Sequence, residues 1–85
     1  MAFRLTDHAE QEITRRGLTR QQVIAVLDHP EQVLDAAGGR KVHQSRVELS
    51  GKIYLIRVIV DPSEDPAAVV SVYRTSKIAK YWRQP

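Results

Sequence analysis

The run of residues from 52 to 60 constrains the fold more than any other part of the sequence. It reads Lys-Ile-Tyr-Leu-Ile-Arg-Val-Ile-Val, so apolar and mostly β-branched side chains occupy both the odd and the even positions. A strand with this pattern is covered on both faces, which is typical of the centre of a sheet. Ser50-Gly51 suits a two-residue hairpin turn and predicts a partner strand over residues 41–49. A third strand is predicted over residues 68–74, beyond an acidic, proline-containing loop.

Two helices are predicted before the sheet. Thr6 can cap a helix that runs to about Arg16, after which Gly17 suits a left-handed C-cap. Thr19-Arg20-Gln21-Gln22 reads as a capping box. The helix that it opens ends near Asp28, because a proline two residues later disfavours helical backbone in the residue between them.

Two shorter elements complete the predicted domain. Residues 31–36 suit an extended segment, and Thr75-Ser76 can cap a short terminal helix in which Ile78 and Trp82 share a face. At 85 residues the chain is long enough for one modest core and too short for two domains. The prediction is therefore a single α+β domain over residues 1–85. An N-terminal helical hairpin packs on an antiparallel sheet of three to four strands, and a short C-terminal helix follows.

The composition suggests a cytoplasmic protein. The longest apolar stretch is interrupted by Arg57 and is far shorter than the roughly 20 residues of a membrane-spanning helix. The N-terminus lacks the apolar run and cleavage site of a secretory signal, and the chain has no cysteine. We therefore expect a reducing compartment and no association with membranes.

Strand alternation assigns side chains to the two faces of the sheet. The hairpin turn pairs Arg46 with Leu55 and Gln44 with Arg57. If Val60 pairs with Ala68, then Leu55 faces Tyr73 and Arg57 faces Ser71. The face expected under the helices then carries Tyr54, Ile56, Val58, Val60, Val70 and Val72. The opposite face carries Gln44, Arg46, Glu48, Arg57, Ser71 and Tyr73. A slip of one residue in either pairing would reverse these assignments.

Arg57 is the most informative side chain, because a charge in a central strand is costly unless it reaches water, a partner or a ligand. One interpretation is a structural ion pair with Glu48 on the neighbouring strand. The other is an anion site shared with Arg46, since two guanidinium groups on one face repel each other unless a negative group lies between them.

The positive charge is concentrated at the C-terminal end. Residues 67–85 carry four basic and no acidic groups, interleaved with aromatic ones, whereas the net charge of residues 1–66 is close to zero. Such a mixture suits phosphates and stacked bases. A solvated helix face is the alternative interpretation. The expected RNA-binding residues are Arg74, Lys80, Tyr81, Trp82 and Arg83.

The sequence favours chemistry without a metal or a cofactor. His8, His29 and His43 are too dispersed for a metal signature, and no glycine-rich phosphate loop or nucleophile elbow is present. Metal-independent RNA cleavage requires only groups that take a proton, give one and neutralise charge as the ribose 2′-OH attacks the phosphate. The candidate catalytic residues are His8, Arg46, Arg57, Tyr73 and Lys77. The alternative for His8 is a surface or packing role, which is the more common one for a histidine in the first turn of a helix.

Several motifs together resemble a widespread bacterial family of unknown function. They are Leu5-Thr6-Asp7-His8-Ala9, Arg16-Gly17-Leu18-Thr19, His29-Pro30-Glu31 and the ending from Val72 to Trp82. The family is similar in layout to toxins of the RelE and BrnT type, which are small ribonucleases encoded beside an antitoxin. The resemblance implies RNA as a substrate, in one version on the ribosome, and an antitoxin protein as a partner.

Three functions therefore stay open on the sequence alone. The first is a ribonuclease toxin, and the second is a noncatalytic RNA- or protein-binding module with the same fold. The third is a structural protein that forms a homodimer through an exposed sheet edge.

Overall fold

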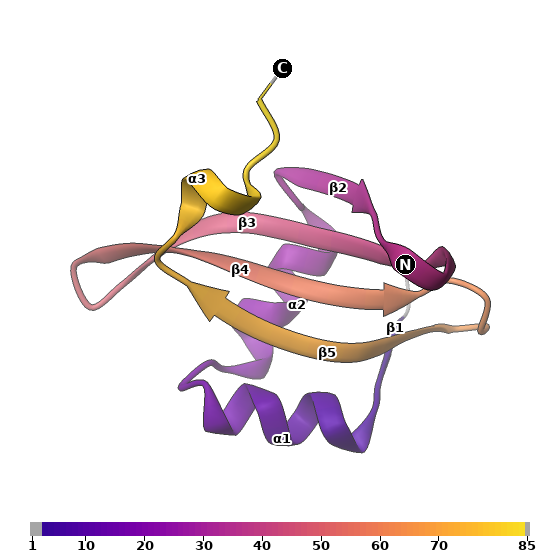
Figure 1. Cartoon of the computed structure of the whole chain (residues 1–85). Helices are drawn as coiled ribbons and strands as arrows, with labels where there is room; N and C mark the ends of the chain where they lie inside the picture. Colours follow the sequence, from indigo (N-terminus) through magenta and orange to yellow (C-terminus); the bar gives the residue numbers. More distant parts are fainter. Residues whose placement is uncertain (1–2, 85) are drawn as a thin grey trace.

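The computed structural model describes residues 3–84 as a five-stranded sheet with helices on both sides. Figure 1 shows α1 and α2 on one side of the sheet and α3 with the C-terminal segment on the other. The elements are β1 (Phe3–Leu5), α1 (Asp7–Arg15), α2 (Arg20–Asp28), β2 (Gln32–Asp35), a 3₁₀ turn (Ala37–Gly39), β3 (Lys41–Leu49), β4 (Lys52–Asp61), β5 (Ala67–Thr75) and α3 (Ile78–Tyr81). The predicted α+β class is confirmed.

The central hairpin has the predicted register. Leu49 pairs with Lys52 across the turn, and Gln44 lies opposite Arg57. Ser50 and Gly51 have φ values of 52° and 82°, which is the left-handed backbone of the turn type that joins two twisted strands most tightly. The tight turn fixes the pairing of β3 with β4, and with it the face of every side chain in the two strands.

The pairing of β4 with β5 differs from the prediction. Arg57 lies opposite Tyr73 and Leu55 opposite Thr75, while Val60 lies opposite Val69. The expected pairs of Val60 with Ala68, Leu55 with Tyr73 and Arg57 with Ser71 are therefore wrong. The register shifts between Ile59 and Val60, which is where an extra residue of β5 is accommodated. As a result Val69 joins the core on the helix side in place of Val70.

A strand that the sequence did not reveal lies at the N-terminus. Phe3–Leu5 pairs in parallel with Ala67–Val69, so the sheet is mixed rather than antiparallel throughout. The Thr6 N–H continues the ladder by donating to the Val69 carbonyl at 3.2 Å. A segment of three residues is too short to show the alternation of a strand. Its partner strand lies more than sixty residues away, so no neighbouring turn indicates the pairing either.

The predicted starts of the two N-terminal helices are confirmed. The Thr6 hydroxyl accepts a hydrogen bond from the Ala9 N–H, and Thr19 and Gln22 form the complete reciprocal capping box. Gly17 has a φ of 68°, which a residue with a Cβ adopts only under strain. None of the helices in residues 3–84 has the length and apolar composition needed to cross a membrane.

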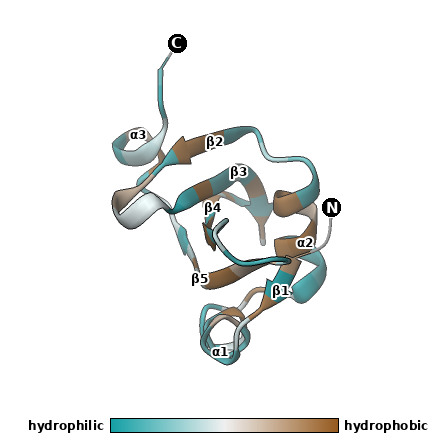
Figure 2. Ribbon diagram, turned by 90° about the vertical axis from the view of Figure 1, so that its right-hand side faces the viewer, coloured by the Kyte–Doolittle hydropathy of each residue, from teal (hydrophilic) through white to brown (hydrophobic). Residues whose placement is uncertain are grey.

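The main core lies between the helices and the sheet. Figure 2 shows hydrophobic segments of α2 and of the strands turned toward each other. The fully buried members of this core include Ala9 of α1, Val23 of α2 and Val58 of β4. The cluster as a whole contains Ala9, Ile13, Leu18, Val23, Val26, Leu27, Ile56, Val58, Val60, Val69 and Val72.

The opposite face of the sheet is also covered in part. Leu55 and Gln44 alternate away from the main core, and both are nevertheless 0% exposed. The α3 end of the chain lies over this face (Figure 1). The last helix begins later than predicted, because Lys77 is its N-cap residue and the Thr75 hydroxyl instead accepts the Lys77 N–H at 3.1 Å.

Candidate functional site

Arg57 lies at the middle of the sheet face that α3 borders. Its Nε donates to Oε1 of Gln44 at 2.9 Å, and Nη1 donates to the Tyr73 hydroxyl. The predicted ion pair with Glu48 is wrong, because Glu48 lies four residues along β3 from Gln44, the residue opposite Arg57. That separation is roughly 13 Å at the rise of a strand. Within residues 3–84 the partners of Arg57 are therefore uncharged.

Two tyrosine rings flank this guanidinium. The Arg57 Cζ lies 4.3 Å from the centroid of Tyr81 and 5.6 Å from that of Tyr73. The two rings meet edge to face with centroids 6.3 Å apart. The arrangement holds the cation by cation–π attraction and leaves its charge uncompensated. We call Arg57, Tyr73 and Tyr81 the arginine–tyrosine cluster.

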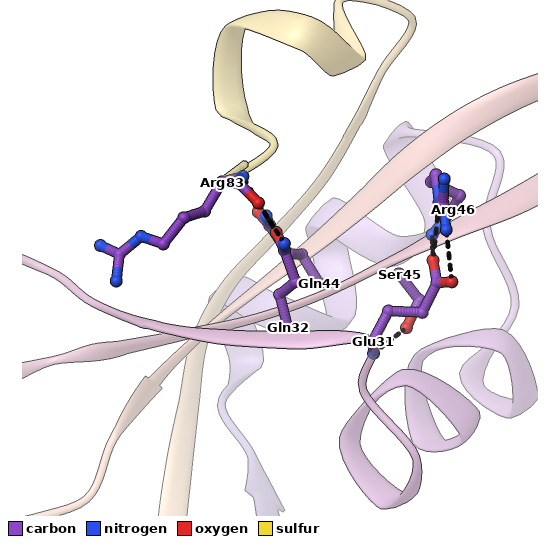
Figure 3. A network of polar contacts seen from close by, with 6 residues as sticks. All are labelled: Glu31, Gln32, Gln44, Ser45, Arg46 and Arg83. Atoms are coloured by element: carbon purple, nitrogen blue, oxygen red, sulfur yellow. Dashed lines mark hydrogen bonds and ion pairs between the residues drawn. The ribbon is translucent and has the colours of Figure 1, made fainter. Parts of the chain in front are cut away.

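A chain of side-chain amide contacts joins Gln44 to the C-terminal segment, and Figure 3 shows Gln44, Gln32 and Arg83 along it. The Nε2 of Gln44 donates to Oε1 of Gln32 at 2.8 Å and to the Tyr81 carbonyl at 3.2 Å. Gln32 in turn bonds the main chain of Arg83 in both directions, donating at 2.7 Å and accepting at 3.1 Å. The side chains of β2 and β3 thereby attach the C-terminal segment to the sheet.

Arg46 shares the face with Arg57, as predicted, but it has an acidic partner. Both oxygens of Glu31 accept hydrogen bonds from its guanidinium, at 3.1 and 2.9 Å, and one also accepts the Arg46 N–H at 2.7 Å. These contacts lower the pKa of Glu31, and the hydrogen bond that Arg46 donates to Glu31 raises the pKa of Arg46. The Trp82 ring stacks 4.1 Å from the Arg46 Cζ. Arg46 therefore brings little net charge to the site.

The remaining cations of the C-terminal segment lie in α3 or next to it in the sequence. Lys77 caps α3, Lys80 lies 5.3 Å from the Tyr81 ring, and Arg83 lines a shallow pocket with Arg46 and Trp82. None of Lys77, Lys80 and Arg83 forms an ion pair with a described residue. The site is consequently positive, in spite of the Glu31–Arg46 pair.

Two predicted site residues lie elsewhere. His8 projects from α1 toward Glu12, with Nε2 and Oε1 3.6 Å apart, so the sheet separates it from Arg57. Arg74 alternates to the helix side, where its guanidinium stacks 4.7 Å from the Tyr54 ring and lies beside Gly17. The structure therefore brings neither His8 nor Arg74 to the arginine–tyrosine cluster.

The two glutamines were not recognised as site residues from the sequence. Gln44 was placed on the correct face, but its full burial and its role as the acceptor for Arg57 depend on how α3 returns to the sheet. The available signal was a neutral polar residue directly opposite a charged one in the hairpin register. Within the described part of the chain, no three histidine, cysteine, aspartate or glutamate side chains come together as a potential metal site.

Comparison with protein families gave one match. A family model described as a domain of unknown function, DUF4258, covers residues 5–74. This range includes Gln32, Gln44, Arg57 and Tyr73, and it ends before α3. Comparison with curated proteins and with solved structures gave no match.

Proposed function

Because the chain belongs to the DUF4258 family, whose function is unknown, we propose from its own side chains that it binds single-stranded RNA through the arginine–tyrosine cluster. The observation that carries the proposal is the setting of Arg57, which is held by uncharged partners next to two aromatic rings. An exposed phosphate supplies the missing negative charge, and an unpaired base can stack on an aromatic ring nearby.

The geometry suits a nucleic acid better than a small anion. A guanidinium has five N–H donors, and Gln44 and Tyr73 take two of them, so three are left for a ligand. Lys77, the N-cap residue of α3, and Lys80 within α3 add positive charge on the same side of the sheet. Trp82 offers a further aromatic surface next to Arg46. Alternating cations and rings match the repeat of phosphate and base along a single strand.

A ribonuclease reaction of the toxin type is the finer form of this proposal. The ribose 2′-oxygen would lose its proton and bond to phosphorus, and the 5′-oxygen would leave and gain a proton. Arg57 would neutralise the charge that develops on the phosphate oxygens, and Tyr73 would exchange the proton. The motivation for this form is the resemblance of the sequence motifs to a family similar in layout to RelE and BrnT toxins, and the proposed partner is an antitoxin.

Noncatalytic RNA binding is the second candidate, and the position of His8 favours it. The only histidine among the expected catalytic residues lies on the other side of the sheet. Tyr73 and Lys77 are then the remaining groups for proton transfer. Binding therefore needs fewer assumptions than cleavage.

Fluorescence anisotropy with a labelled single-stranded RNA tests binding. Arg57→Ala should weaken binding roughly tenfold, within the range of 1–3 kcal/mol per stacked or phosphate contact. It should also flatten the dependence of log Kd on log salt by about 0.7 for each phosphate that the protein no longer neutralises. Arg15→Ala is the matched control, because it removes the same charge from the opposite side of the molecule. Equal effects of the two variants would show that RNA senses only the net charge.

Cleavage requires a separate measurement. The same RNA is incubated with the protein in EDTA and analysed for products that end in a 2′,3′-cyclic phosphate. Tyr73→Phe should abolish the products while RNA is still bound, because only the hydroxyl is removed. Binding without products in the unaltered protein would rule out the ribonuclease form. Growth arrest on expression, relieved by Arg57→Ala, would support a toxin.

A further inference from the structure

We propose that Gln44 is a positioning residue that sets the orientation of the Arg57 guanidinium and makes it depend on the docked C-terminal segment. The inference rests on the proposed function, because the ligand that Arg57 would meet is the phosphate of RNA. Gln44 is 0% exposed and lies directly opposite Arg57 in the sheet. It acts through Arg57 and does not itself reach the ligand.

Hydrogen bonds connect the Arg83 main chain through Gln32 and Gln44 to Arg57, and their donor-to-acceptor directions are fixed at the Arg83 end. The Arg83 main chain has one donor and one acceptor, so the Gln32 side chain can pair with both in only one orientation. Its Oε1 then faces Gln44, whose Nε2 must turn toward it and toward the Tyr81 carbonyl. The Oε1 of Gln44 is left facing Arg57, where it accepts the Nε–H.

An amide at this position has a consequence that a carboxylate would not have. A buried arginine in a sheet is commonly balanced by an acidic side chain, which satisfies its donors and cancels its charge. Gln44 fixes the donor geometry through a neutral oxygen, so the charge of Arg57 is retained for a ligand. With Nε bonded to Gln44 on β3, Nη1 reaches the Tyr73 hydroxyl on β5.

The arrangement links two regions that the sequence separates. Gln44 bonds Arg57 through its oxygen and the C-terminal segment through its nitrogen, and both contacts use one rigid amide. If Tyr81 and Arg83 leave the sheet, the Gln44 amide loses the Tyr81 carbonyl as an acceptor. Its other acceptor, Gln32, stays in β2 but loses the Arg83 contacts that fix its own orientation, and Tyr81 also leaves the Arg57 guanidinium. Correct positioning of Arg57 and docking of the segment are therefore coupled.

A double-mutant cycle with labelled single-stranded RNA tests the inference. Gln44→Met keeps the length of the side chain and removes its hydrogen bonds. We expect it to weaken binding on the order of tenfold, as for the loss of a hydrogen bond to a charged group. In an Arg57→Ala background the same substitution should have no further effect, because the residue that it positions is gone. Circular dichroism and urea unfolding establish that each variant is folded at the temperature of the assay.

Gln44→Glu provides a second variant, which retains the size of the residue and an acceptor for Arg57 but replaces the amide N–H donors with an oxygen. Its carboxylate should neutralise Arg57, so the salt dependence of RNA binding should fall to that of Arg57→Ala. A role of Gln44 in stability alone would leave this slope unchanged. The variant also allows the test to proceed if Gln44→Met does not fold.

The outcomes separate the inference from the proposed function. Losses from Gln44→Met and Arg57→Ala that add in the double variant, or a Gln44→Glu protein with the unaltered salt dependence, would overturn the positioning role and leave RNA binding standing. An Arg57→Ala protein that binds RNA like the unaltered chain would refute the proposed function, and the inference with it.

Discussion

Replacing Leu55 with alanine tests whether the C-terminal segment covers the sheet as the structure shows. Leu55 is 0% exposed although it faces away from the main core. The substitution removes three carbon atoms, which amounts to about 2.4 kcal/mol at roughly 0.8 kcal/mol for each buried methylene. An incompletely collapsed cavity increases such losses, and measured Leu-to-Ala costs are roughly 2–5 kcal/mol. We therefore expect a loss of about 3 kcal/mol.

Ile53 provides a matched control on the same strand and the same face. It lies two residues from Leu55, and it is 47% exposed. Ile53→Ala should cost about 1 kcal/mol, since roughly half of its side chain already contacts water. Urea unfolding followed by circular dichroism measures both variants. For a domain of this size a loss of about 3 kcal/mol lowers Tm by roughly 12–24 °C.

Similar losses for the two variants would refute the reasoning. That result would mean that water reaches Leu55 in solution and that the segment containing Tyr81 does not cover this face. The hydrogen bonds from Gln32 and Gln44 to the segment would then be absent as well. The arginine–tyrosine cluster would lose its second ring, which makes this stability measurement a test of the site.

Two further predictions concern pH and helix capping. Burial lowers the pKa of His43 below its ordinary 6.5, and its Nδ1 is buried without a hydrogen-bond partner in the described structure. The unfolded chain therefore takes up the proton first, so stability should fall as the pH drops below about 6.5, and His43→Phe should flatten urea midpoints measured between about pH 7 and 5. Thr19→Ala removes the capping box of α2 and should cost about 1 kcal/mol in urea unfolding, with Thr19→Ser restoring most of it; an unchanged midpoint would mean that α2 does not depend on its cap.

Features with local causes could be predicted from the sequence. The capping box at Thr19 and the turn at Ser50-Gly51 each depend on neighbouring residues, so the start of α2 and the register of β3 with β4 are confirmed. Membership of a family of unknown function, expected from the motifs, is confirmed as well. The parallel strand β1 and the shift in β5 depend on contacts between distant segments, which no short pattern encodes.

The same distinction holds for the candidate site. Strand alternation correctly put Arg46, Arg57 and Tyr73 on one face, because the shift in β5 moves Tyr73 by two residues relative to the expected pairing and so preserves its face. The type of a residue does not indicate which side of a sheet its helix will cover. The sequence therefore could not show that His8, a candidate for proton transfer, lies on the opposite side of the sheet from Arg57. The partners of Arg57 became evident only with the path of α3.

Alternation also divides the residues of the basic C-terminal segment between the two faces of the sheet. Tyr73 and Arg74 are neighbours in the sequence but lie on opposite faces of β5, Tyr73 beside Arg57 and Arg74 beside Tyr54. A count of positive charges in this segment therefore overestimates what a ligand on one face would meet. Glu31 offsets the charge of a further cation, Arg46, through an ion pair that raises the pKa of Arg46. The charge that remains is concentrated around Arg57, and an anion that binds this face should depend on this residue more than on the net charge of the protein.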